Sequence, residues 1–265
     1  MAIRQWKGSN KNVLITGASS GIGLELARMF ASGGSGLVLV ARNEAALERL
    51  AEELRRQYDI PVTVMAEDLS DPTAPDRILV QLAERGLRID ALVNNAGAGY
   101  SGEFLDIPWE RDEQVMQLNM ASLTKLTKEL VRGMRERKSG AVLNVASTGS
   151  YQPGPLTAVY YASKAYVLSL TLALRRELEP YGISVSALCP GATRTAFSER
   201  AGKQDQPGAM SPERVARIGY DAFCKGKAVI VPGFGNKAAV AVSCLLPGTL
   251  LAGMVYRIQE RVLRK

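Results

Sequence analysis

Histidine is absent from this 265-residue chain, and cysteine is scarce. Without histidine, any proton transfer near neutral pH must come from another side chain. The three cysteines, Cys189, Cys224 and Cys244, are odd in number, far apart and without the spacing of metal ligands. They indicate reduced thiols in a cytoplasmic protein rather than a disulfide framework, and no metal site is expected.

The chain also lacks any long block of like charge, although it is basic overall. Its 33 Lys and Arg against 26 Asp and Glu give a net charge of +7. Such an excess can indicate nucleic acid or another anionic partner. Here the basic residues are scattered, with small clusters only at 132–138 and 257–265. A solvated surface is therefore favoured, and nucleic-acid binding is not expected.

No linker, low-complexity segment or internal repeat divides the chain. Its polar, basic start has no apolar core, unlike a secretory signal. With 46% hydrophobic residues the chain should bury one large core, so residues 1–265 are interpreted as a single domain.

A long apolar run lies in the C-terminal extension, residues 236–265. Residues 238–256 contain no charged side chain, which satisfies the length criterion for a membrane span. Pro247-Gly248 lies inside the run and predicts a break between two short helices, the second beginning near Thr249. A core or substrate-pocket element is favoured. A membrane span and peripheral membrane contact are the alternatives.

Short runs rich in Val, Ile and Leu alternate with amphipathic stretches such as Glu44–Tyr58 along most of the chain. The near-continuous hydrophobicity of these runs is typical of strands buried on both faces. Strand alternating with helix predicts an α/β fold, a doubly wound parallel sheet of about seven strands. The expected strands are residues 12–16, 36–40, 62–66, 91–94, 140–145, 183–188 and 228–231.

A glycine-rich turn, Thr16 to Gly23, follows the first expected strand and opens a helix. Glycines there allow positive φ and close approach of the backbone to a pyrophosphate, and a helix N-terminus favours the anion. The glycine spacing is GxxxGxG rather than GxGxxG. The residues interpreted as phosphate-binding are Gly17, Ser19, Ser20, Gly21, Ile22 and Gly23.

The end of the second expected strand bears on the choice of cofactor. An NAD site places a carboxylate there, but this chain has Ala41 followed by Arg42. Arg42 can pair with a 2′-phosphate, which a carboxylate would repel, so NADP(H) is favoured over NAD(H). The alternative is that Arg42 is only a surface charge. Asp68 and Leu69, after the third strand, are expected near the adenine, although Asp68 could instead cap the following segment.

Tyr160 is the only tyrosine with a lysine, Lys164, four residues later. On a helix this spacing places both side chains on one face. A cation at ~4 Å in an effective dielectric of ~20 is worth ~4 kcal/mol, which would lower the phenol pKa from ~10 to roughly 7. Tyr160 is therefore a candidate general acid/base. Ser147, thirteen residues upstream, is a candidate partner.

Two further motifs follow later strands: Asn94-Asn95-Ala96-Gly97 after the fourth and Pro190-Gly191 after the sixth. With the motifs above they form an ordered set that resembles the short-chain dehydrogenase/reductase family of the compact, single-domain type. The resemblance spans roughly residues 12–195 and implies a Rossmann fold. The set consists of the glycine turn, these two motifs, Asn119, Ser147, Tyr160 and Lys164.

The resemblance implies a role for each matching residue. Tyr160 would exchange a proton with a substrate oxygen that Ser147 holds in place. Lys164 would contact the nicotinamide ribose and lower the Tyr160 pKa, and Asn119 would fix a water in a proton relay. Thr193 stands where the family more often has valine. The remaining expected cofactor contacts are Asn95, Ala96, Gly97, Pro190, Gly191, Thr193 and Thr195.

Two segments bear on assembly and substrate. The segment Val159–Leu178 is apolar almost all round, so one face needs a partner, which predicts a homodimer or homotetramer also involving residues 111–137. Residues 196–212 are expected to be a mobile loop over the substrate, with a disordered connector as the alternative. Tyr100, Tyr151, Leu156 and the C-terminal segment favour a lipophilic carbonyl compound as substrate.

The leading interpretation is an NADP(H)-dependent oxidoreductase that transfers hydride between the nicotinamide and a small-molecule carbonyl or alcohol. One alternative is a non-catalytic NADP-sensing binding protein, against which the complete catalytic set argues. The other is a membrane-associated lipid or steroid reductase, suggested by the C-terminal extension.

Overall fold

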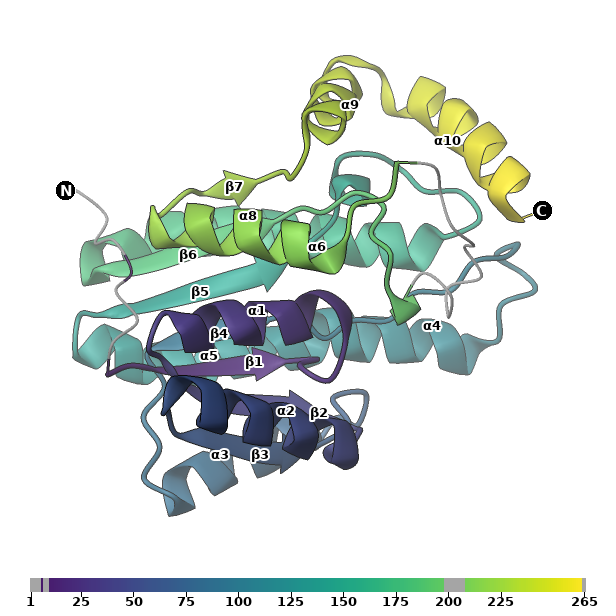
Figure 1. Ribbon diagram of the computed structural model, residues 1–265. Coiled ribbons are helices and arrows are strands. Elements are labelled where there is room, and N and C mark those ends of the chain that lie inside the picture. Colours follow the sequence, from purple (N-terminus) through teal and green to yellow (C-terminus); the bar gives the residue numbers. More distant parts are fainter. Residues whose placement is uncertain (1–5, 7–9, 198–207, 264–265) are drawn as a thin grey trace.

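The protein is described by a computed structural model that places residue 6 and residues 10–197 and 208–263. Within these residues, seven parallel strands form one sheet in the order β3-β2-β1-β4-β5-β6-β7 (Figure 1). The predicted doubly wound α/β fold is confirmed. The strands are β1 (Asn12–Thr16), β2 (Gly36–Ala41), β3 (Val62–Ala66), β4 (Ala91–Asn94), β5 (Gly140–Val145), β6 (Ile183–Leu188) and β7 (Val229–Ile230).

The strand bounds differ from the expected ones in only two places. β2 is one residue longer, because Ala41 still pairs with Ala66 of β3. β7 is shorter than residues 228–231, because this edge strand pairs with β6 only through Val229 and Ile230. The buried strands were predictable because every residue in them contributes to one hydrophobic signal.

Helices cover both faces of the sheet. One core contains side chains of α1, α2 and α8, such as Phe30, Leu47 and Phe223, and the other contains side chains of α3, α5 and α6, such as Ile78 and Leu126. The helices are α1 (Gly21–Ser32), α2 (Glu44–Tyr58), α3 (Ala74–Glu84), α4 (Trp109–Met116), α5 (Leu123–Glu136), α6 (Ala158–Leu178), α8 (Pro212–Cys224), α9 (Phe234–Leu245) and α10 (Gly248–Leu263).

The expected helix over residues 111–137 contains an irregularity. Between α4 and α5 lies a π-helical segment, η1 (Gln117–Ser122), which adds an extra residue to the turn that holds Asn119. Such π segments interrupt the 3.6-residue periodicity and are frequent at functional sites. Two short 3₁₀ helices, η2 (Thr148–Tyr151) and η3 (Glu179–Tyr181), complete the described elements.

A chain of buried polar side chains crosses the middle of the sheet. Asn94 donates to Thr127 of α5 and to Asn144 of β5, at 2.8 Å each. Asn144 in turn donates to Thr171 of α6 at 2.9 Å. Because buried amides need partners, this chain fixes α5 and α6 relative to the ends of β4 and β5.

The apolar C-terminal extension forms two helices, as Pro247-Gly248 predicted. α9 ends at Leu245 and α10 begins at Gly248 (Figure 1, yellow). In the described part of the chain, no helix combines the length and apolar character needed to cross a membrane.

Candidate active site

A cleft of about 1140 Å³ runs along the carboxyl ends of the strands. It crosses the point where β1 is flanked by β2 on one side and β4 on the other, the position at which doubly wound sheets bind ligands. All but two of the site residues expected from the sequence line it. The expected residues that do so are Gly17, Ser19, Ser20, Gly21, Ile22, Arg42, Asp68, Leu69, Asn95, Ala96, Gly97, Ser147, Tyr160, Lys164, Pro190, Gly191, Thr193 and Thr195.

Gly23 and Asn119 lie behind the cleft rather than in its lining. A Cβ on Gly23 would come within 2.3 Å of Asn95 Nδ2 and of the Gly17 carbonyl oxygen. Asn95 Nδ2 donates to the carbonyls of Thr16 and Gly17, at 2.9 and 3.1 Å. Gly23 therefore lets α1 approach the turn closely enough for Asn95 to hold the turn in shape.

The turn has the properties that an anionic diphosphate requires. Gly17 and Gly21 adopt positive φ, 67° and 56°, which side chains with a Cβ rarely adopt. Ser20 is the N-cap of α1, and its side chain makes no capping hydrogen bond. The first backbone N–H groups of a helix have no intrahelical acceptor, so this end of α1 offers donors and a positive dipole to an anion.

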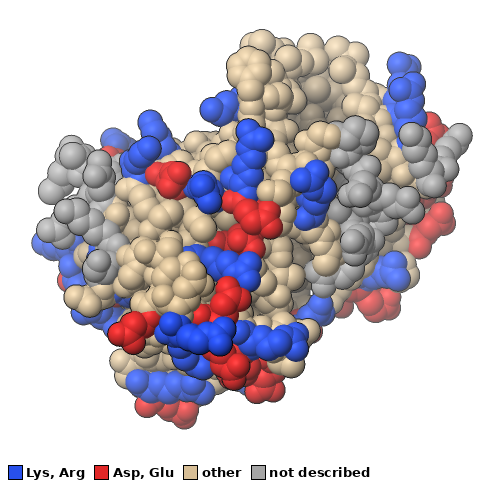
Figure 2. Space-filling view, in the orientation of Figure 1, with Lys and Arg blue, Asp and Glu red and all other residues tan. Residues whose placement is uncertain are grey.

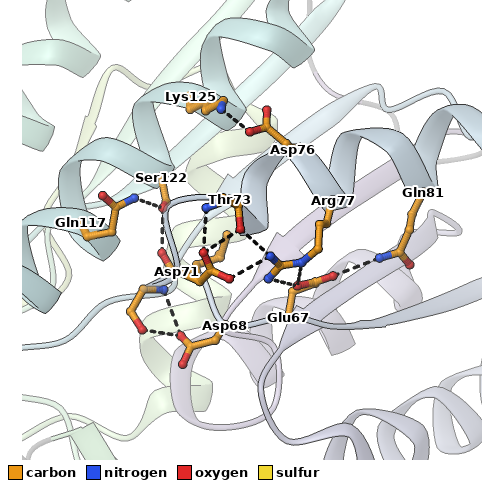
Figure 3. Close-up of polar contacts among 12 residues, drawn as sticks. Glu67, Asp68, Asp71, Thr73, Asp76, Arg77, Gln81, Gln117, Ser122 and Lys125 are labelled. Atoms are coloured by element: carbon orange, nitrogen blue, oxygen red, sulfur yellow. Dashed lines mark hydrogen bonds and ion pairs between the residues drawn. The ribbon is translucent and has the colours of Figure 1, made fainter.

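The loop after β3, which carries Asp68 and Leu69, is held by a polar network (Figure 3). Arg77 of α3 donates to Glu67 at 2.7 Å and to Asp71 at 2.8 Å. Ser122 at the end of η1 donates to the Leu69 carbonyl at 2.7 Å. This wall of the cleft is thus positioned by α3 and by the helix that carries Asn119.

Arg42 and Asp68 face each other across that end of the cleft. Arg42 Nη1 lies 3.6 Å from Asp68 Oδ2, and the two side chains are 57% and 44% exposed. Asp68 Oδ1 also accepts hydrogen bonds from the Ser70 backbone and hydroxyl, at 2.9 and 2.7 Å. Asp68 therefore caps the turn that leads to Asp71-Pro72, as the alternative expectation held, while the N-cap of α3 is Thr73.

Ser147, Tyr160 and Lys164 meet at the opposite end of the cleft. Lys164 is only 5% exposed, and its Nζ donates to the Val145 carbonyl at the end of β5, at 2.8 Å. The same Nζ lies 5.9 Å from the centre of the Tyr160 ring. Ser147 follows β5, caps η2 and forms a hydrogen bond with Tyr160. One strand end and one helix therefore position all three side chains.

The expected lowering of the Tyr160 pKa is wrong for this structure. Burial raises the pKa of the Tyr160 phenol to about 12, and hydrogen bonding to Ser147 offsets only part of that rise. Burial also lowers the pKa of the Lys164 ammonium to about 8. The sequence argument counted the attraction of the cation but not the cost of removing both groups from water. At neutral pH the pair is therefore a neutral phenol beside a buried ammonium.

Asn119 is fully buried and fixed by three hydrogen bonds. It exchanges hydrogen bonds with the backbone N–H and carbonyl of Ala98, at 2.9 Å each, and donates to Ser163 at 2.9 Å. Gly97 runs between Asn119 and Lys164, since a Cβ on Gly97 would lie 3.2 Å from Asn119 Oδ1 and 3.4 Å from Lys164 Nζ. Asn119 thus ties the chain after β4 to α6.

The segment after β6 closes the cleft beside the glycine turn. Thr195 packs against Gly21, where an added Cβ would come within 3.0 Å of the threonine methyl carbon. Thr193 forms a parallel bridge with Met210, which ties the chain just before the expected substrate loop, 196–212, to the final residues of that loop. Residues 198–207 of that loop lie outside the described residues. Ala196, Phe197 and Ala209 line the cleft, and Phe197 packs on the Tyr160 ring at 5.5 Å between ring centres.

Sequence reasoning missed part of the cleft wall. Gln259 of α10 is buried, lines the cleft and donates to the Tyr161 hydroxyl at 2.9 Å. No local signal could identify Gln259, because its place depends on how α10 packs. Of the apolar candidates, Tyr100 lines the cleft, whereas Tyr151 approaches Cys189 and Leu156 lines a smaller pocket beside Tyr160.

Comparison with known proteins decides the family. The family model described as short chain dehydrogenase matches residues 11–206. The chain belongs to this family. As a short-chain dehydrogenase it is an oxidoreductase that uses a nicotinamide cofactor, and the glycine turn and cleft fit such a dinucleotide.

Three similar members illustrate how far the likeness extends. Dehydrogenase/reductase SDR family member 7B of Mus musculus is 33% identical over 266 residues, covering 95% of this chain and 82% of that protein. A short-chain dehydrogenase from Sphingobium yanoikuyae in complex with NADPH has 35% identity and a TM-score of 0.82, covering 88% and 91% of the two chains. A 7β-hydroxysteroid dehydrogenase has 26% identity and a TM-score of 0.84, covering 96% and 99%.

The packing of Gly23 predicts that Gly23→Ala weakens dinucleotide binding. The added methyl group must displace Asn95 or the Gly17 carbonyl, and small displacements at a binding site are costly. We expect the dissociation constant for the nicotinamide dinucleotide, measured by calorimetry with NADPH and with NADH, to rise tenfold or more for the one that the wild type binds, on the order of 1.4 kcal/mol.

Gly253→Ala on α10 is the matched control, because a Cβ there meets no atom within 4 Å. It should bind NADPH like the wild type. Equal affinities for Gly23→Ala and the wild type would contradict this account of the turn.

Proposed function

We propose that this short-chain dehydrogenase is an NADP(H)-dependent carbonyl reductase, able to oxidise the corresponding alcohol, with Tyr160 as its general acid/base. The observation that carries the proposal is the meeting of Ser147, Tyr160 and Lys164 at one end of the cleft whose other wall is the glycine turn. The non-catalytic alternative has no comparable observation in its favour.

In the reducing direction Tyr160 gives its hydroxyl proton to the substrate oxygen. Its raised pKa keeps it protonated at neutral pH, so the acid form is present before substrate arrives. Ser147 donates to the same oxygen and orients it, and the Lys164 ammonium stabilises the phenolate left on Tyr160. The nicotinamide, when bound, supplies hydride to the carbonyl carbon or accepts it from the alcohol.

We propose that Gly17, Ser19, Ser20, Gly21, Ile22 and Gly23 cradle the pyrophosphate, and that Arg42 binds the adenosine 2′-phosphate with Asp68 and Leu69 near the adenine. Asn95, Ala96 and Gly97 would line the nicotinamide ribose, together with Tyr160 and Lys164. Asn119 positions α6 and the chain after β4, which holds Lys164 in place. We propose in addition that Asn119 fixes a water in a proton relay from Lys164. Pro190, Gly191 and Thr193 would face the carboxamide, and Thr195 would offer its hydroxyl to the carboxamide or to a phosphate.

The substrate we propose is a lipophilic carbonyl compound. Tyr100, Phe197 and Ile258 give the substrate end of the cleft an apolar lining, with Gln259 as a buried polar group. The similar 7β-hydroxysteroid dehydrogenase supports this class, since its name specifies a steroid and the likeness extends over nearly the whole chain. We propose that the protein is cytoplasmic and that its substrate is a small molecule.

Replacing the phenol tests the catalytic role. Tyr160→Phe should lower kcat for carbonyl reduction by 10²- to 10⁴-fold, the usual contribution of a general acid, while the dissociation constant for NADPH stays the same. The loss of kcat is measured as NADPH oxidation against a panel of aldehydes, ketones, quinones and β-ketoacyl esters.

The pH dependence tests the charge on Lys164. In the wild type, kcat/KM should be level below about pH 8 and fall above it, because Lys164 then loses the charge that stabilises the phenolate.

A wild type inert toward the whole panel would favour a cofactor-binding protein without turnover. A Tyr160→Phe variant as active as the wild type would remove Tyr160 from the mechanism.

The cofactor preference depends on Arg42. Arg42→Ala should weaken NADPH binding about 10- to 100-fold, the usual cost of losing a charge-assisted pair, and leave NADH binding unchanged. The similar Sphingobium enzyme, whose structure contains NADPH, supports this preference. Arg85→Ala, an exposed arginine at the end of α3, is the control. Equal losses of affinity for NADPH and NADH in Arg42→Ala would show that Arg42 does not bind the 2′-phosphate.

We further propose that the protein is a homodimer or homotetramer assembled through α6 and the α4–α5 unit. α6 presents Tyr166 and Leu172, 36% and 44% exposed, and Tyr166 shares a hydrogen bond with Thr124 of α5 at 2.8 Å. This pairing makes one continuous surface of two helices. Sedimentation at micromolar concentration should give a dimer or tetramer, and a monomer would refute the proposal.

A further inference from the structure

The C-terminal cap, α9 and α10 (Phe234–Leu263), is anchored on its inner side. Leu251, Val255 and Gln259, which recur every four residues along α10, are buried. Besides the Gln259–Tyr161 bond, Ser243 of α9 donates to Gln152 at 3.0 Å. The cap therefore has a fixed orientation on the domain, and the direction of its outer face is fixed with it.

That outer face is apolar. In α9 none of the residues is buried, and Phe234 and Leu245 are 88% and 84% exposed. On α10, Leu250, Met254 and Ile258 form an exposed stripe four residues apart. Figure 2 shows the top of the upper lobe, where Figure 1 places α9, as uncharged, with basic side chains to its right. The outer patch consists of Phe234, Val242, Leu245, Leu250, Met254 and Ile258, each at least 45% exposed.

Basic residues border the outer patch. Lys237 on α9 and Arg257 and Arg261 on α10 are exposed, and Glu260 is the only acidic residue in the cap. Arg257 and Arg261 are one turn apart and adjoin the stripe of Leu250, Met254 and Ile258. An apolar helix face bordered by cations is typical of helices that lie in the interface of an anionic bilayer.

A second copy of the chain fits the patch less well. A two-fold contact would place the same surface on both sides, so the cations Lys237, Arg257 and Arg261 of one copy would meet a surface on which Glu260 is the only acidic residue. Like charges across an interface oppose association, whereas anionic lipid headgroups complement the border and acyl chains accept the apolar centre.

The patch is continuous with the mouth of the cleft. Ile258 is 59% exposed on the outer stripe and also lines the cleft, next to the buried Gln259. A surface that rests on the patch therefore lies beside the entrance through which a lipophilic compound would reach Tyr160.

We propose that the outer patch docks the protein on the surface of an anionic bilayer, with the two helices lying in the interface and none crossing it. Docking would allow a lipophilic substrate to pass from the bilayer into the cleft, and this part of the proposal rests on the proposed function. The docking itself does not.

The test is co-sedimentation of the full chain with vesicles of phosphatidylcholine, with and without phosphatidylglycerol. The wild type should bind the anionic vesicles, and binding should weaken as salt is added. Leu245→Asn combined with Leu250→Asn should lower partitioning at least tenfold, since two exposed apolar contacts are lost. Val80→Asn, a 54% exposed apolar residue on α3 at the far end of the molecule, is the matched control and should bind like the wild type.

The basic border is tested separately. Arg257→Gln with Arg261→Gln should lower partitioning onto anionic vesicles about thirtyfold, since each basic residue near such a surface is worth ~1 kcal/mol. Arg257→Lys with Arg261→Lys should restore it. No vesicle binding by the wild type, or equal binding by the Leu245/Leu250 variant, would overturn the proposal. A shift of that variant to a smaller species in sedimentation would overturn it too, because the patch would then be a subunit interface.

NADPH oxidation without vesicles separates this proposal from the proposed function. The Leu245 and Leu250 substitutions lie outside the cleft, so the variant should retain turnover while losing vesicle binding. A protein that binds vesicles but reduces no carbonyl would leave the docking intact and refute only the function.

Discussion

A buried ammonium group organises this protein. Lys164 is almost completely removed from solvent, and its Nζ is held by the Val145 carbonyl at the end of β5. Burying a cation costs free energy, and burial therefore lowers the pKa of the Lys164 ammonium to about 8. The residues around the ammonium must then leave room for it and keep its hydrogen-bond acceptor in place. Gly97 passes beside it without a side chain, and Asn119 holds the neighbouring backbone. The site therefore forms only where α6 packs against the carboxyl ends of β4 and β5.

The sequence predicted the architecture well because the relevant signals are local. Parallel strands buried on both faces are continuous apolar runs, and the amphipathic stripe of Glu44–Tyr58 gives the bounds of α2. The motifs that follow β1, β4 and β6 lie at one edge of the sheet by topology alone, so their convergence could be predicted once the strands were assigned. The break at Pro247 was visible for the same local reason.

Features that depend on tertiary packing could not be predicted in this way. The π-helical turn at Asn119 interrupts a helix whose sequence gives no sign of it. Gln259 reaches the cleft only because α10 folds back over α6, a contact between residues 98 positions apart. The Tyr160 pKa was misjudged because spacing reveals a neighbouring charge but not the loss of solvent around the phenol. Electrostatics inside a protein depend on burial, which a spacing does not specify.

The C-terminal cap connects the active site to the molecular surface. Its inner side contacts the helix of Tyr160 through Tyr161, while its outer side is apolar and bordered by cations.

The central claim concerns proton and hydride transfer at Tyr160. Its most direct test is mass spectrometry of the alcohol formed from a carbonyl compound and NADPH that carries deuterium at both C4 positions of the nicotinamide. The account predicts one deuterium at the former carbonyl carbon with the wild type, and at least a hundredfold less product with Tyr160→Phe. An unlabelled alcohol, or equal yields from the two proteins, would contradict it.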